Sequence, residues 1–200
     1  MQLNARSTRT ILGAAVGVAV FAGAFLHAPA SGATQRFATG LTPLLDAANG
    51  KTIGTVGPGA ALNVIGESGA ATHVTVTGFA AQSTPATVYA YADRHIIVLG
   101  GFSGKAVNGA TQSVGGTAYV AVTIDGWVAS NALAPDAATV WKAASALYQQ
   151  KCSTCHSLRP PTDYTANQWP ALMKVQADNA GLDPGETALI TAYLQTQSGK

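Results

Sequence analysis

The chain holds only two cysteines, and both lie in the short stretch Cys152-Ser153-Thr154-Cys155-His156. This stretch matches the C-x-x-C-H sequence at which haem c is attached. Two thiols at this spacing can add across the two vinyl groups of one porphyrin, and the adjacent imidazole then becomes an axial ligand of the iron. The sequence therefore predicts one covalent haem c, with Cys152 and Cys155 as attachment residues and His156 as the proximal iron ligand.

The same two cysteines have other possible roles, because C-x-x-C also occurs in redox dithiols and as half of a zinc site. A structural zinc site needs four ligands, and two cysteines cannot supply a paired C-x-x-C set. A thioredoxin-like dithiol needs a βαβ pattern that this chain lacks. Covalent haem is the favoured interpretation, and a disulfide or dithiol is the alternative.

The sixth iron ligand can be approached by elimination. Removal of an N-terminal leader would take Met1 and His27 with it, which leaves Met173, His73 and His95 as soft or imidazole candidates. Met173 is the favoured distal ligand because it follows the motif on an expected helix. Three alternatives stay open: Met173 fills the core, a histidine is the ligand, or the iron is open or water-bound.

Three helices are expected around this site. The first begins at Asp136 as N-cap and carries Val140, Ala144, Leu147 and Tyr148 on one face until it reaches Cys152. Such a segment has a very small core, and a porphyrin would supply apolar surface that the polypeptide lacks. The apo-protein is therefore expected to fold poorly.

The second and third helices are expected from their own caps. Asn167 would cap the second, which tolerates Pro170 in its first turn and ends near Gly181. Asp183 would cap the third, with a proline at its first position and Glu186 three residues after the cap.

Residues 152–158, 163–170 and 192–194 resemble the C-terminal monohaem domain of pentahaem cytochromes that serve trimethylamine N-oxide or dimethyl sulfoxide reductases. The resemblance implies a class I cytochrome c fold for residues 135–200. In that family the ligand methionine sits about two turns after the tryptophan, where this chain has Gln176. Met173 lies one turn after it, on the same helix face.

The middle of the chain, residues 36–134, changes to short β-branched runs separated by Gly-rich turns, which predicts an antiparallel sandwich or small barrel. Expected strands are 53–56, 62–65, 73–77 and 119–124, with turns at 57–59, 67–69 and 125–126. Residues 50–69 and 125–133 resemble bacterial SH3-like domains. Because these two places are far apart, an insertion or a degenerate second unit is expected near Gly104-Lys105.

The expected fold class is therefore α+β multidomain, with an N-terminal all-β SH3-like barrel followed by an all-α class I cytochrome c domain. Ahead of both, residues 11–26 are apolar and Ala28-Pro29-Ala30 matches a signal-peptidase site, so 1–30 reads as a signal peptide. The predicted location is periplasmic. Retention of residues 11–26 as an inner-membrane anchor is the alternative, although this run is shorter than the ~20 residues of a spanning helix.

The charge pattern excludes some partners. The net charge of +2 comes from Arg6 and Arg9, and no basic patch for nucleic acid is present. No acid–base pair or nucleophile accompanies the haem motif, so the chain is expected to be an electron carrier rather than an enzyme. A quinol-side donor and a terminal reductase or oxidase are the expected partners. The alternative is a haem-based small-ligand sensor whose SH3-like module docks on peptide or cell-wall material.

Overall fold

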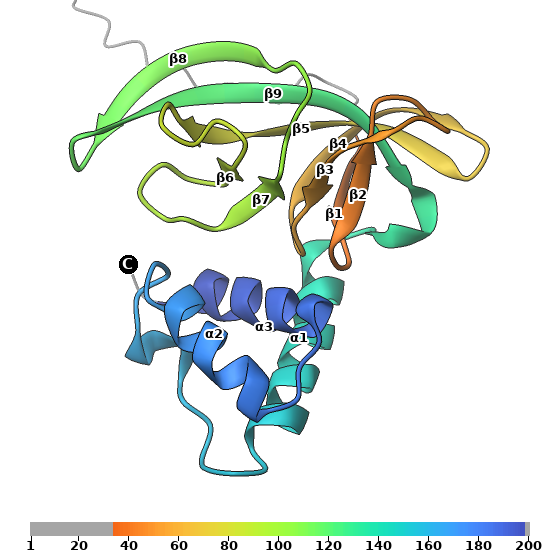
Figure 1. Cartoon of the computed structure of the whole chain (residues 1–200). Coiled ribbons are helices and arrows are strands. Elements are labelled where there is room, and N and C mark those ends of the chain that lie inside the picture. Colours follow the sequence, from red (N-terminus) through yellow and green to blue (C-terminus); the bar gives the residue numbers. More distant parts are fainter. Residues whose placement is uncertain (1–33, 199–200) are drawn as a thin grey trace, which may run out of the picture. The chain divides into compact units, whose positions relative to one another are not determined.

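The structure, a computed structural model, describes residues 34–198. Strands come first along the chain and three α-helices follow (Figure 1). The strands are β1 Gln35–Ala38, β2 Thr42–Leu45, β3 Thr52–Val56, β4 Ala61–Ser68, β5 Ala71–Ala81, β6 Val88–Tyr89, β7 Ile97–Gly100, β8 Val107–Val114, β9 Thr117–Ala129 and β10 Leu133–Ala134. The helices are α1 Ala137–Cys152, α2 Trp169–Asn179 and α3 Pro184–Gln197, with short 3₁₀ helices at Ser130–Ala132 and Pro161–Asp163.

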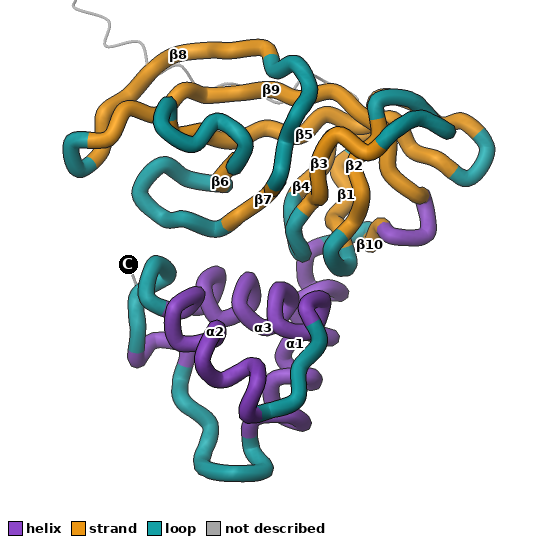
Figure 2. Tube along the Cα trace, viewed as in Figure 1, coloured by secondary structure: helices purple, strands orange, loops and turns teal. Residues whose placement is uncertain are grey.

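All ten strands belong to one antiparallel sheet, in the order β10-β1-β4-β5-β6-β7-β3-β2-β9-β8. An additional pairing of β5 with β9 closes a circuit of six strands, β5-β6-β7-β3-β2-β9. The two long strands are paired from Ala71↔Ala129 to Ala81↔Tyr119. These strands, β5 and β9, both belong to the closed circuit, and the extension β4-β1-β10 continues from β5 (Figure 2).

The predicted fold class, an SH3-like barrel followed by an all-α class I cytochrome c domain, is wrong. The described residues are mainly β, with a six-strand closed circuit inside a ten-stranded sheet and only three α-helices near the C-terminus. The described residues all fall within one compact unit. The segment after Gly104-Lys105, where an insertion or second unit was expected, forms β8, which pairs with β9 in the same sheet.

One predicted turn explains part of this error. Asp125-Gly126 lies inside β9, not at a strand end. A Cβ atom at residue 126 would lie 2.7 Å from Leu44 Cδ1 and 2.9 Å from the Leu45 carbonyl oxygen, so glycine permits β2 to approach β9 closely. The real turn is Gly115-Gly116, where both residues have positive φ angles, 56° and 81°, as a tight hairpin requires.

The four predicted strands are confirmed as parts of β3, β4, β5 and β9. Their alternation places one face in the core: Val74, Val76 and Ile124 are almost completely buried. The core of the sheet is also built from Leu44, Val56, Leu62, Val88, Leu99 and Val128. Each strand of the closed circuit contributes buried residues to this cluster, so the circuit encloses one hydrophobic core.

The predicted first and third helices are confirmed with their caps. The Asp136 carboxylate accepts from the Thr139 amide at 2.7 Å, and the first helix reaches Cys152. Asp183 and Glu186 form a reciprocal capping box at the start of α3. The predicted cap of the second helix is wrong, because α2 begins at Trp169 and its N-cap residue is Gln168, not Asn167. The Gln168 side chain makes no capping interaction with the helix and instead accepts from the Thr165 amide at 2.9 Å.

A further contact defines the setting of the helices. Trp141 of α1 lies so close to Gly59, whose φ angle is 72°, that a Cβ atom there would overlap the indole. The turn before β4 therefore packs directly against α1.

The predicted signal peptide, residues 1–30, lies outside the described residues. Among the described helices, none is both long and apolar enough to cross a membrane.

Candidate functional site

The first helix delivers the cysteine motif at its C-terminal end. Cys152 is the last residue of α1 and is half-buried against the helical core, whereas Cys155 is exposed in the turn that follows. The Thr154 hydroxyl donates to the Lys151 carbonyl at 3.1 Å, which holds this turn against the helix end. Two free thiols are thus presented from a short and locally fixed segment.

The electrostatic setting of Cys152 differs from that of a redox dithiol. Burial, and secondarily the neighbouring Cys155 thiol, raises the pKa of Cys152 above its ordinary value. Reactive dithiol sites instead lower the pKa of the attacking cysteine with nearby positive charge or a helix N-terminus. This cysteine is at a helix C-terminus, whose dipole disfavours a thiolate, so the site is poorly suited to thiol–disulfide exchange.

The imidazole of His156 is oriented by the backbone. Its Nδ1 atom lies 2.7 Å from the Ser157 carbonyl oxygen. A carbonyl can only accept, so Nδ1 carries the proton and Nε2 keeps its lone pair. A hydrogen bond of this kind fixes the tautomer and ring orientation in metal-ligating histidines. The geometry therefore leaves Nε2 as the atom available to a metal.

A cavity of about 840 Å³ lies beside the motif. Its volume falls within the range of roughly 300–1,000 Å³ that is usual for small-molecule and cofactor sites. Both thiols, His156 and Met173 line it. The remaining walls include Tyr148, Lys151, Leu158, Arg159, Pro160, Asp163, Tyr164, Trp169, Leu172, Gln176, Asn179 and Ala180.

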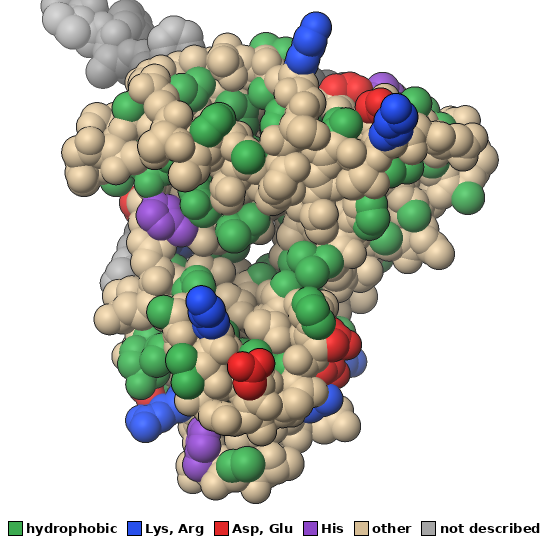
Figure 3. Space-filling model, viewed as in Figure 1, with side chains coloured by type: hydrophobic (Ala, Val, Ile, Leu, Met, Phe, Trp, Pro, Cys, Tyr) green, Lys and Arg blue, Asp and Glu red, His purple; other side chains and the backbone are tan. Residues whose placement is uncertain are grey.

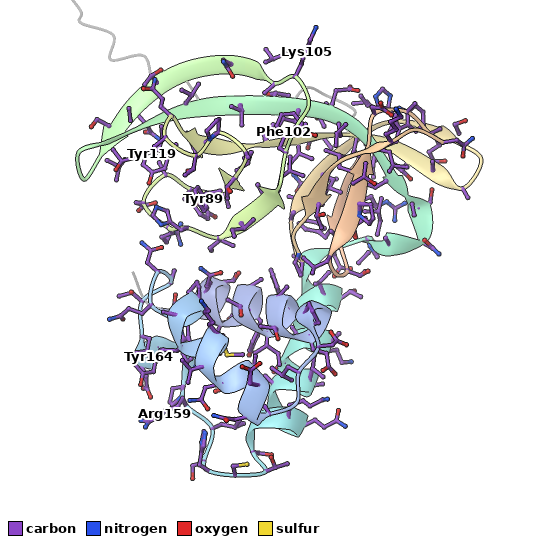
Figure 4. All side chains as sticks on the ribbon, viewed as in Figure 1. Tyr89, Phe102, Lys105, Tyr119, Arg159 and Tyr164 are labelled. Carbon is purple, nitrogen blue, oxygen red and sulfur yellow. The ribbon has the colours of Figure 1, made fainter. Side chains whose placement is uncertain are left out.

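The segment between α1 and α2 is pinned over this cavity at two points. The Tyr148 hydroxyl donates to the Arg159 carbonyl at 2.8 Å, and the Trp169 indole donates to the Pro161 carbonyl at 3.0 Å. Tyr164 packs edge-on against Trp169, with the ring centroids 5.0 Å apart. Arg159 and Tyr164 are labelled on this segment in Figure 4. Helical periodicity indicated Tyr148, and the family resemblance included Tyr164 and Trp169, but neither pattern pointed to Arg159 or Pro161.

Met173 lines the cavity and is also part of the helical core, where it packs with Trp169, Ile190 and Leu194 and is 3% exposed. His73 and His95 do not line the cavity. His73 bonds Asp125 at 2.7 Å and stacks on Trp127, while His95 bonds the Tyr119 hydroxyl at 2.8 Å. The structure thus brings Cys152, Cys155, His156 and Met173 together, and leaves His73 on β5 and His95 in the loop between β6 and β7 outside the cavity.

These residues fit a covalently attached porphyrin. The cavity joins apolar and aromatic walls to two thiols and to an imidazole whose Nε2 is free for iron, which is the donor set that haem c requires. Within residues 34–198, no three side chains of His, Cys, Asp or Glu gather as a cluster that could hold a metal ion. A metal at this site would therefore have to arrive with its own additional ligands, as iron does in a porphyrin.

Comparisons with known proteins point to the same class. Residues 148–200 match the model of the family "Dihaem cytochrome c". The chain is also 28% identical over 148 residues to the Cytochrome c-type protein TorY of Escherichia coli O157:H7. This alignment covers 72% of the chain but only 40% of that relative's length. No solved structure matches the chain significantly.

Both matches support a c-type cytochrome with covalently bound haem. The family model and the relative are both named as c-type cytochromes, which supports the prediction of an electron carrier rather than a substrate-converting enzyme. The family model extends from Tyr148 of α1 to the C-terminus and so includes the motif and the whole cavity.

Proposed function

We propose that this chain carries single electrons through one haem c, attached at Cys152 and Cys155, with His156 Nε2 as proximal ligand and Met173 as distal ligand of the iron. The observation that supports this most directly is that the C-x-x-C-H segment lines a cavity of about 840 Å³ together with Met173. The Ser157 carbonyl holds the imidazole in the tautomer that ligation needs.

A single haem is proposed because the chain contains one C-x-x-C-H sequence and no cysteine outside it. The matching family is described as dihaem. Covalent attachment of a second haem would need another pair of thiols or another mode of binding. The number of haems per chain is therefore a quantity to be measured, and one is the expected value.

The haem would supply reversible one-electron transfer at its iron, with a potential set by its axial ligands and by the polarity of its surroundings. The chain's own residues would do the rest. Tyr148 and Trp169 hold the segment after the motif in place through its carbonyl groups. Trp169, Leu172 and the buried core behind Met173 exclude water from the distal side.

The partners and the location belong to this proposal as well. We expect a periplasmic protein that takes electrons from a quinol-side donor and passes them to a terminal oxidoreductase. Residues 1–30 would act as signal peptide or anchor, 36–134 as the β region and 135–200 as the haem region. The relative in Escherichia coli is named as a c-type cytochrome, and the chain spans less than half of it, so its own partners are not carried over.

A second candidate function is supported by the mixed lining of the distal side, where Gln176 and Asn179 accompany Met173. A haem iron without a sixth protein ligand would bind a small gas or anion, and these amide side chains could hydrogen-bond to it. In this case the protein would be a haem-based sensor. Rapid carbon monoxide binding by the reduced wild-type protein would favour this candidate over the carrier.

The test is maturation of the full chain in a bacterial periplasm with a haem c attachment system. Wild-type protein is expected to retain haem on a denaturing gel and to give one haem per chain by pyridine haemochrome assay. Cys152→Ser with Cys155→Ser should lose it, because both thioethers are then missing. Thr154→Ala is the matched control inside the motif and should keep its haem. Wild-type protein without covalent haem would disprove the proposal.

A further inference from the structure

Asn167, which lies between the cavity-lining residues Tyr164 and Trp169, forms hydrogen bonds with the β region. Asn167 Oδ1 accepts from the His95 amide at 2.7 Å, and Asn167 Nδ2 donates to the Asp93 carbonyl at 2.9 Å. These two bonds satisfy both ends of the amide and join it to the backbone of the loop between β6 and β7. The residue expected from sequence to cap α2 is therefore used to bind that loop.

A second side-chain amide, that of Gln195, joins α3 to Ala166 and to the same loop between β6 and β7. Gln195 of α3 is 4% exposed, and its Nε2 atom donates to the Ala166 carbonyl at 2.8 Å and to the His95 carbonyl at 3.1 Å. Ala166 is itself almost fully buried. Because buried amides are costly to leave unpaired, this arrangement fixes residues 166–167 between α3 and the β loop.

The loop can serve as a fixed point because its own position is determined by the sheet. His95 Nε2 lies 2.8 Å from the Tyr119 hydroxyl, and Tyr119 of β9 is 4% exposed. The His95 ring also packs on Tyr89 of β6 at a centroid distance of 4.7 Å. Figure 4 shows Tyr89 and Tyr119 on this part of the sheet. A rigid β scaffold thus holds the backbone that Asn167 binds.

We infer that the loop Asp93–Ile96 of the β region positions the distal wall of the cavity, with Asn167 and Gln195 as the positioning residues for Met173. This inference rests on the proposed function. Trp169 begins α2 two residues after Asn167, and Met173 follows one turn later on the same face. Local bonds close the first turn of α2, since the Gln168 side chain accepts from the Thr165 amide at 2.9 Å. The Asn167 and Gln195 contacts are the hydrogen bonds that tie this turn to the β loop and to α3.

The consequence is a defined place for the thioether. Functional side chains need to be held within about 0.5 Å of their working geometry by the residues behind them. Loss of a partner behind a metal ligand typically costs about 10–100-fold in metal affinity or activity. Removal of the Asn167 amide should therefore weaken methionine ligation without removing the haem, which stays attached at the cysteines and at His156.

The experiment compares Asn167→Ala with Asn108→Ala, a matched control on the exposed strand β8. The full haem-loaded chain is used. For Asn167→Ala we expect normal haem content, a weakened red-region band of methionine-ligated ferric haem, roughly 10-fold faster carbon monoxide binding and a lowered midpoint potential. Asn167→Asp keeps the acceptor but loses the donor, so it should lie between the wild type and Asn167→Ala.

A second pair of variants tests the loop itself. His95→Ala removes the bond to Tyr119 and should shift the same spectral band, whereas His73→Ala removes a comparable histidine bond toward the opposite end of the β5–β9 pair and should not. If Asn167→Ala and His95→Ala both leave the band and the carbon monoxide rate unchanged, the inference is wrong even though the proposed function stands. If Met173→Ala leaves the wild-type spectrum unchanged, methionine ligation and this inference both fail while covalent haem attachment remains.

Discussion

At the scale of single residues, two positions on α2 bear on the distal iron ligand: Met173, and position 176, where the resembling family has its methionine and this chain has Gln176. Met173 and Gln176 both line the cavity, but Met173 is also packed among core residues. We predict that Met173→Ala removes the methionine–iron band and lowers the midpoint potential, since a thioether ligand stabilises reduced iron. Gln176→Ala is the control and should change neither quantity. Optical spectra and a redox titration of the purified holoprotein provide the measurement.

At the residue level, the sequence singles out candidates where one residue carries its own chemistry, and the structure places Cys152, Cys155, His156 and Met173 around one cavity. The motif residues and Met173 could be chosen because thiol, imidazole and thioether groups are rare in this chain. Asn167 could not be chosen correctly, since an asparagine before a helix is an ordinary N-cap. Its true partners, Asp93 and His95, are far away in sequence, and only the fold brings them together.

At the scale of elements, the start of α1 offers a pH test. The Thr139 amide lowers the pKa of Asp136 below its ordinary value because the charged carboxylate is the better acceptor. A lowered folded-state pKa contributes stability that is present above the unfolded value of about 4 and is lost as the pH falls through the folded value. Asp136→Asn keeps a capping oxygen without this titration.

We therefore predict that wild-type holoprotein loses more thermal stability than Asp136→Asn when the pH is lowered from about 5 into the acid range. Thermal unfolding followed by circular dichroism at several pH values measures the difference between the two curves. Parallel curves for the two proteins would contradict a charged cap at this helix.

The crossing of β2 and β9 gives a second test at this scale. At Gly126 a Cβ atom would lie within 2.9 Å of two residues of β2. We predict that Gly126→Val destabilises the protein by about 1–3 kcal/mol, as overpacking of a closed core usually does. Gly109→Ala is the control, because its Cβ atom would meet Ala121 only at 3.5 Å. Urea unfolding should shift for the first variant and not for the second.

The sequence predicted strands correctly where hydrophobic alternation within a short segment was sufficient. It failed where the conformation depends on a contact with a residue far away in sequence. Val74 and Val76 alternate with threonines, and this local pattern was enough to place β5. Gly126 was interpreted as a turn because Asp-Gly usually is one. Its actual role depends on Leu44, which lies in a strand much earlier in the chain, and no local pattern reports such an approach.

At the scale of the whole molecule, the pairing of β5 with β9 explains why the predicted fold class was wrong. Two distant segments that resembled the ends of a small barrel are joined by strands β6, β7 and β8 of the same sheet. Strand order depends on contacts between residues far apart in sequence, which periodicity does not encode. The sequence was informative about strands and helices, but not about how the circuit closes.

The low charge of the molecule leads to a prediction about docking. The chain has 11 Lys and Arg residues against 9 Asp and Glu, and charged side chains are few and scattered on the face shown in Figure 3. Steered association depends strongly on ionic strength. We therefore predict that reduction rates with a redox partner change little, about twofold or less, between low and physiological salt. Stopped-flow kinetics across a salt series measure this, and a steep decrease would contradict the prediction.

The order of the elements along the chain has a consequence for maturation. The last strand of the sheet, β10, pairs with β1 through Ala134 and Phe37, and both precede the cysteines. Every strand has therefore emerged from a ribosome or a translocation channel before Cys152, whereas Met173 and α3 emerge after it. An enzyme that attached haem while the chain was still emerging would meet the two thiols after all ten described strands and before α2 and α3. Thioether formation would then take place on an open site, which the last two helices would close.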